Sequence, residues 1–176
     1  MSQAKITFDD AIRDAEEMLA HFDKVNTQPP PENAEVLKRA GLIMAFTAWE
    51  TYVEDRVAEA LRTRLGTEGD TPATRFVQRR LEDELKRFNN PNSDKTRRLF
   101  LDFLEIDVTT SWTWNQYDCA KVKSTLDDLI GKRGEAVHRS KATRNGSPAP
   151  HLVTREDLKR AINFLKSLVA ATERAL

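Results

Sequence analysis

The sequence predicts an all-α fold, a bundle of five to six helices within a single domain that covers residues 1–176. Apolar residues recur at three- and four-residue steps in at least four segments, which is the period of amphipathic helices. Clusters of proline, glycine and asparagine separate these segments. Hydrophobic residues make up 39% and charged residues 32% of the chain, which is typical of a folded domain with charged helix surfaces.

The first two helices are expected on either side of a proline run. Between residues 8 and 25, one apolar stripe predicts a helix; its members are Phe8, Ala11, Ile12, Ala15, Leu19 and Phe22. The prolines at 29–31 end it, and Pro31 suits the first turn of the next helix because its missing N–H needs no partner there. That second helix should run to about Leu65, before a polar loop that begins near Gly66.

Two shorter helices should follow, at residues 74–88 and 94–105. The Asn89-Asn90-Pro91-Asn92 cluster breaks the pattern between them. Residues 107–118 contain β-branched and aromatic side chains without clean alternation, so a short strand and an ordered loop are both open, and we favour the loop.

The last two helices enclose a segment that is too rich in glycine, proline and serine to be helical, at 139–151. The earlier one should begin near Asp118 and reach the glycines at 131 and 134. In the later one, Thr154 can cap the N-terminus and Asp157 lies favourably in the first turn. Its apolar stripe extends to Leu176.

Charge and cysteine content exclude several classes of site. The 28 basic and 28 acidic residues cancel, so any site for a polyanion must be a local patch. The single Cys119 and three scattered histidines have no zinc-binding spacing, and we expect no metal and no cofactor. The N-terminus lacks a signal-peptide core and no apolar run could span a bilayer, which predicts a cytoplasmic protein without membrane contact.

The segment from Arg133 to His138 pairs a residue suited to proton transfer with one suited to phosphate binding. Histidine titrates near neutral pH and can move protons, whereas arginine offers a charged planar fork that matches phosphate oxygens. Basic residues crowd around this segment against the single acid Glu135 and form a local patch that would support an anion site: Lys132, Arg139, Lys141 and Arg144. Spacing alone favours ordinary helix-terminal charges, with an ion pair between Glu135 and Arg139.

The spacing of Arg133 and His138 resembles the R-x4-H motif of the HEPN family. The upstream aromatic and acidic run at 49–55, WETYVED, is similar to the RiboL-PSP type of HEPN domain. The resemblance covers roughly residues 34–176 and implies a helical fold, metal-independent RNA cleavage by Arg133 and His138, and a dimer in which two motifs meet. When this resemblance is taken into account, a functional role for Arg133 and His138 is favoured over the interpretation as ordinary helix-terminal charges. Gly134 departs from the family, which often has a polar residue directly after the arginine.

Geometry leaves two arrangements open for this motif. Residues five apart on a straight α-helix are separated by about 140° around its axis, so Arg133 and His138 would not share a face. Either the helix is broken between them, as Gly131 and Gly134 permit, or two chains assemble the site.

Glu50 is a third candidate catalytic residue, because it falls in the apolar stripe of the second helix. A carboxylate withdrawn from water needs a partner, protonation or a position at the edge of a cleft. It either rims the core or reaches Arg133 or His138 and orients it. Trp112, Trp114 and Tyr117 could stack on bases, but packing is the favoured interpretation of these rings.

The sequence therefore supports two functions. The first is a metal-independent endoribonuclease, a toxin or defence effector as the resemblance implies, with an RNA substrate, a homodimeric site and an antitoxin protein as partner. The second is a non-catalytic helical module that binds RNA or a protein through the same region around Arg133 and His138. Gly134 favours this second function.

Overall fold

The computed structural model describes residues 1–27, 31, 34–66, 71–138 and 153–176. Within these ranges it contains six α-helices, one 3₁₀-helix and no strand, which confirms the predicted all-α bundle. The elements in chain order are α1 (Gln3–Val25), α2 (Ala34–Leu65), α3 (Pro72–Leu85), α4 (Ser93–Leu104), η1 (Val108–Ser111), α5 (Cys119–His138) and α6 (Arg155–Glu173).

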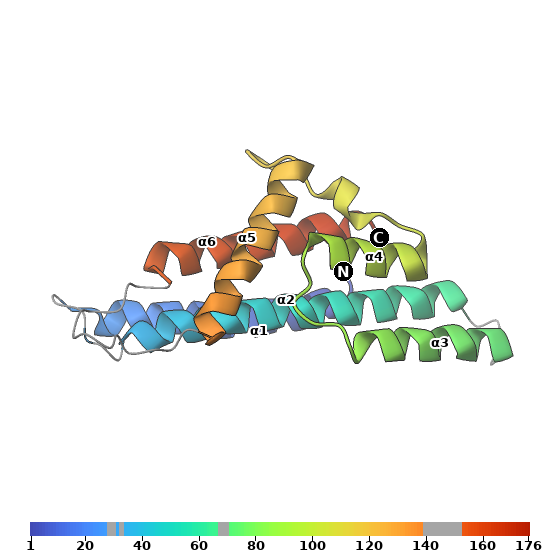
Figure 1. Ribbon diagram of the computed structural model, residues 1–176, viewed down its shortest axis with the longest axis horizontal. Helices are drawn as coiled ribbons and strands as arrows, with labels where there is room; N and C mark the ends of the chain where they lie inside the picture. The colour runs from blue at the N-terminus through green and yellow to red at the C-terminus, as the bar shows by residue number, and fades with distance from the viewer. Residues whose placement is uncertain (28–30, 32–33, 67–70, 139–152) are drawn as a thin grey trace.

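Helix α2 is the central element of the bundle. It packs along α1, and α4, α5 and α6 contact it from the other side, while α3 flanks its C-terminal half. Figure 1 shows α5 crossing the α2 and α6 pair at a steep angle. Gly41 allows close packing at the junction of α1, α2 and α6, because a Cβ there would lie 2.9 Å from a Leu158 methyl and 3.2 Å from Met18 Cβ.

Polar side chains mark the helix starts where the sequence allows it. Ser2, Asn92 and Thr154 accept hydrogen bonds from the first turns of α1, α4 and α6, satisfying N–H groups that have no partner within a helix. Thr154 and Asp157 form the predicted reciprocal capping box of α6. These contacts define where the three helices begin, while packing of their apolar faces supplies most of their stability.

The core is one cluster of buried apolar residues that draws on every helix. Its largest fully buried side chains include Trp49, Trp112 and Tyr52, and Trp49 contacts both of the other rings. The indole of Trp112 donates to Thr172 Oγ1 at 3.0 Å, so its polar atom is satisfied. Among the helices of the described ranges, none is long and apolar enough to cross a membrane.

Two local expectations need correction. Helix α5 does not end at the glycines but continues through Gly131 and Gly134 to His138; a glycine inside a helix costs only about 1 kcal/mol relative to alanine, which neighbouring packing can offset. The segment 107–118 is neither a strand nor a plain loop. It forms η1 and then a tight turn in which Trp114 and Tyr117 pair by their backbones.

Candidate active site

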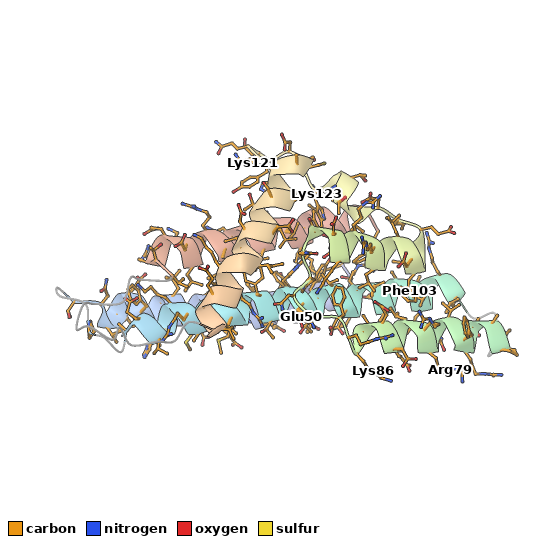
Figure 2. The ribbon with its side chains drawn as sticks, in the orientation of Figure 1. Glu50, Arg79, Lys86, Phe103, Lys121 and Lys123 are labelled. Carbon is orange, nitrogen blue, oxygen red and sulfur yellow. The ribbon has the colours of Figure 1, made fainter. Side chains whose placement is uncertain are left out.

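The loop between α3 and α4 is anchored on two consecutive residues of α2. The buried indole of Trp49 donates to the Pro91 carbonyl at 3.0 Å, and the Asn90 backbone N–H donates to Glu50 Oε2 at 3.0 Å. Asn90 adopts a left-handed conformation, with φ of 46°, which asparagine tolerates better than most residues. The loop is thus held at a defined position beside the middle of α2, where Figure 2 labels Glu50.

Arg133 of α5 reaches this loop. Its Nη1 donates to Asn90 Oδ1 at 2.7 Å, and its Nε is buried without a hydrogen-bond partner among the described residues. Two turns earlier on α5, Asp127 accepts from both the backbone N–H and the hydroxyl of Ser93, each at 2.8 Å. These contacts fix α5 against the start of α4 and hold the Arg133 guanidinium in one place.

Glu50 and Arg133 are therefore joined through Asn90 and not by a direct contact. The Glu50 carboxylate is half-buried and binds the Asn90 backbone, while Arg133 binds the Asn90 side chain. Between the described atoms, no ion pair connects Glu50 with Arg133. The expected direct contact of Glu50 with Arg133 is therefore not formed, because both side chains bind Asn90 of the intervening loop. The alternative contact with His138 concerns a side chain outside the described part of the structure.

Asn90 is the residue of this network that the sequence did not single out. Its cluster was interpreted only as a helix breaker, although a signal was present, since asparagine is among the residues that most readily adopt a left-handed conformation in a loop. Its partners lie 40 and 43 positions away along the chain, and no local pattern indicates such contacts.

Of the remaining predicted site residues, the structure describes the side chain of Lys132 only. His138 is the last residue of α5, and its side chain lies outside the described part of the structure, as do Arg139, Lys141 and Arg144. Lys132 points to α6 instead, where its Nζ contacts Asp157 Oδ1 at 2.9 Å. The structure thus joins Arg133 to Glu50 through Asn90, and it gives Lys132 a partner in the first turn of α6.

The acidic run on α2 has an unusual protonation equilibrium. Burial and then the charges of Glu50 and Asp55 raise the pKa of the Glu54 carboxyl to about 7. Glu54 therefore exchanges its proton near neutral pH, one turn along α2 from Glu50. Within the described ranges, no group of three or more histidine, cysteine, aspartate or glutamate side chains could hold a metal ion.

The all-helical bundle and the position of Arg133 and His138 on one helix agree with the fold that the R-x4-H resemblance implies. The model of the RiboL-PSP-HEPN family matches residues 9–176, and the chain belongs to this family. Neither a curated protein nor a solved structure matches the chain.

Proposed function

We propose that this protein is a metal-independent endoribonuclease that cleaves RNA at a site formed by Arg133, His138 and Glu50. The observation that carries the proposal is the state of Arg133. Asn90 fixes one end of its guanidinium, while the buried Nε keeps a donor without a partner. A buried unsatisfied donor costs about 1–3 kcal/mol, so its presence on an arginine of the R-x4-H segment calls for an explanation, which a functional role of Arg133 supplies.

Two side chains, those of His138 and Arg133, act directly in the proposed reaction. The ribose 2′-oxygen attacks the adjacent phosphorus, the bond to the 5′-oxygen breaks, and a 2′,3′-cyclic phosphate remains. His138 takes the 2′-hydroxyl proton or supplies one to the leaving oxygen. Arg133 stabilises the negative charge on the phosphorane through its planar donors. Glu50 is the positioning residue, because it holds the loop that holds Arg133.

The continuity of α5 favours a site shared between two chains. Because α5 is unbroken from Cys119 to His138, Arg133 and His138 leave its axis about 140° apart. Each chain supplies one histidine in the motif, whereas transesterification benefits from both a base and an acid. A two-fold homodimer would bring two histidines and two arginines around one phosphate. A dilution series should then show falling specific activity, with the mass followed by light scattering; a monomer with full specific activity would exclude the shared site.

The proposal includes the biological setting that the family suggests. RNA is the substrate, and the basic residues Lys132, Arg139, Lys141 and Arg144 contact its backbone, with Lys132 exchanging its partner Asp157 for a phosphate. The enzyme acts as a toxin or defence effector, neutralised by an antitoxin protein.

Gly134 supports a second candidate, a non-catalytic module that binds RNA or a protein. A Cβ at this position would meet nothing within 4 Å, so packing does not require glycine there. The chain simply lacks the polar side chain that often follows the arginine in the family, which would remove one group from the reaction centre.

RNA cleavage in EDTA separates the two candidates. The wild type should cleave and leave 2′,3′-cyclic phosphate ends, or the 3′-phosphate from their hydrolysis, and His138→Ala should lose about 10²- to 10⁴-fold in rate. Arg79→Ala, on the exposed surface of α3, is the matched control and should cleave like the wild type. Equal rates for His138→Ala and wild type would remove His138 from the site, and absence of cleavage by the wild type would favour the binding module.

A further inference from the structure

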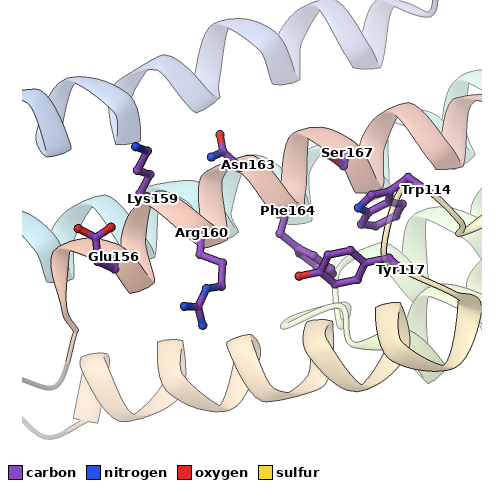
Figure 3. A pocket seen from close by; sticks show the side chains of 8 residues that line it. All are labelled: Trp114, Tyr117, Glu156, Lys159, Arg160, Asn163, Phe164 and Ser167. Carbon is purple, nitrogen blue, oxygen red and sulfur yellow. The ribbon is translucent and has the colours of Figure 1, made fainter.

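A groove that the proposed reaction does not use lies over α6, between α5 and the turn that precedes it. It has a volume of about 480 Å³, within the range of roughly 300–1,000 Å³ that is usual for ligand sites. Figure 3 shows its lining, which combines aromatic rings at one end with polar and charged side chains along α6: Trp114, Tyr117, Phe164, Ser167, Asn163, Arg160, Lys159 and Glu156.

The aromatic end is a preformed platform. Trp114 and Tyr117 stack with their centroids 5.1 Å apart, and both rings rest on Phe164 at 5.6 and 5.8 Å. The turn that holds them is closed by two backbone hydrogen bonds and places Gln116 at a φ of 67°, a strained value for a residue with a side chain. Trp114 and Tyr117 are partly exposed, so part of the platform is accessible to a ligand.

Positive charge predominates along the rest of the groove. Arg160 points from α6 toward α5 (Figure 3) and makes no hydrogen bond or ion pair with another described residue. Lys159, the residue before it, points to the other side of α6, toward α1 (Figure 3), and Lys121 places its ammonium 4.9 Å from the centre of the Tyr117 ring. The one acid of the lining, Glu156, already accepts a hydrogen bond from Arg155. In a protein without net charge, this is a local cationic surface beside exposed rings.

We infer that this groove binds a short single-stranded segment of RNA, with a base stacked against the Trp114 and Tyr117 platform and a backbone phosphate on Arg160. Rings that accept a base face, next to a cation that accepts a phosphate, are the pattern by which proteins hold single strands. A duplex hides its base faces, so it does not fit the platform. The inference rests on the proposed function for the choice of RNA, and it adds a substrate-binding region apart from Arg133.

The position of the groove suits such a role. It extends along α6 from Ser167 to Glu156, next to Asp157, which binds Lys132 of α5. Arg133 is the neighbour of Lys132 in the chain. A strand held in the groove would therefore leave it close to the end of α5 that carries the R-x4-H segment.

Binding of 2′-O-methyl oligoadenylate tests the groove without cleavage, because this probe lacks the attacking 2′-hydroxyl. With a fluorescein label and anisotropy detection, Tyr117→Ala should weaken binding at least about fivefold, and Arg160→Ala should reduce the salt dependence by about 0.7 in slope. Phe76→Ala and Arg79→Ala, on the exposed face of α3, are the matched aromatic and basic controls and should bind like the wild type.

Tryptophan fluorescence gives an independent readout. Trp49 and Trp112 are fully buried, so acrylamide quenching reports mainly on Trp114. The probe should protect Trp114 from acrylamide, and Trp114→Phe should abolish the protected signal. Unchanged affinity in Tyr117→Ala and Arg160→Ala, or polyglutamate binding with the same dependence on both residues, would overturn the inference. If the groove variants bind like the wild type but the protein still cleaves RNA, the inference about the groove fails and the proposed function remains. If binding depends on the groove but the protein does not cleave RNA, the proposed function fails and the inference about the groove remains.

Discussion

Two polar networks lie on α2 and differ in how completely their hydrogen bonds are formed. In the first, Glu173 Oε1 accepts from the Ser2 hydroxyl at 2.8 Å, the Tyr52 hydroxyl at 2.9 Å and Arg56 Nε at 2.8 Å. In the second, Glu50 and Arg133 meet at Asn90, and the buried Nε of Arg133 has no partner among the described residues. In the first network the carboxylate oxygen has three donors, whereas in the second one buried donor has no partner among the described residues.

The electrostatics of the first network agree with a structural role. Although burial works in the opposite direction, hydrogen bonds from Ser2 and Tyr52, together with Arg56, lower the pKa of Glu173. The carboxylate joins both ends of the chain to α2, and its stabilising effect is present above the pKa of an unfolded glutamate and is lost as the pH falls. The comparison teaches that a polar network with all its hydrogen bonds formed has a structural explanation, whereas a buried donor without a partner, as on Arg133, needs another one.

Removal of the Glu173 carboxylate, whose oxygen accepts three hydrogen bonds, should have the largest effect on stability. Glu173→Ala leaves Arg56 half-buried without its partner, which should lower the free energy of unfolding by about 3–5 kcal/mol. Urea denaturation at neutral pH measures the loss, and Glu173→Gln should lose less because its amide oxygen still accepts hydrogen bonds. RNA cleavage by the folded fraction should not change. A loss below about 1 kcal/mol would mean that this network does not hold the chain ends.

Arg133→Ala should behave in the opposite way. Cleavage should fall by about 10²- to 10³-fold because the charge on the phosphorane loses its donors, while the free energy of unfolding should change by about 1 kcal/mol or less, since one hydrogen bond is lost and one unsatisfied donor disappears. Arg133→Lys keeps the charge but not the planar fork, and should recover only part of the rate. A large loss of stability without loss of activity would place Arg133 with the structural network.

Asn90 can be tested with a pair of variants that separate its side chain from its backbone. Asn90→Gly keeps the left-handed conformation and the N–H that binds Glu50 but removes the oxygen that holds Arg133, so cleavage should fall about tenfold, or about 1.4 kcal/mol, with little change in stability. Asn90→Ala should add about 1–2 kcal/mol of backbone strain. Cleavage rates and urea midpoints of the two variants separate the effect of the Asn90 side chain from that of its backbone. Equal cleavage by wild type and Asn90→Gly would show that Arg133 needs no positioning by the loop.

The smallest expected effect concerns pH. The folded-state pKa of Glu54, about 7, lies above its unfolded value near 4.5, so the folded protein holds this proton more tightly and Glu54 lowers stability as the pH rises between these values. Glu54→Gln should therefore gain stability relative to the wild type, little at pH 4.5 and about 1 kcal/mol above pH 7, allowing for solvent screening of a partly exposed group. Thermal unfolding at several pH values measures this difference, and a constant difference would contradict the raised pKa.

Much of the fold could be predicted because its signals are local. The stripe from Phe8 to Phe22 lies within α1, and the Thr154 and Asp157 pair caps α6 as expected. The sequence also indicated Arg133 and Glu50 as candidate site residues and suggested a direct contact of Glu50 with Arg133 or His138, but it did not indicate that Asn90 lies between Glu50 and Arg133. Helix propensity wrongly suggested an end for α5 near Gly131, since the weak local cost of glycine did not decide where that helix stops.

The sequence by itself determined that the chain forms amphipathic helices and which residues are candidates for proton transfer and phosphate binding, because periodicity and side-chain type are properties of short segments. Only the tertiary structure decided that Asn90 mediates between Glu50 and Arg133 and that Trp114 and Tyr117 form a platform on Phe164. The physical reason is that these contacts join residues 40 to 50 positions apart. Their geometry arises from the packing of α2, α5 and α6, which follows from burial of one shared core.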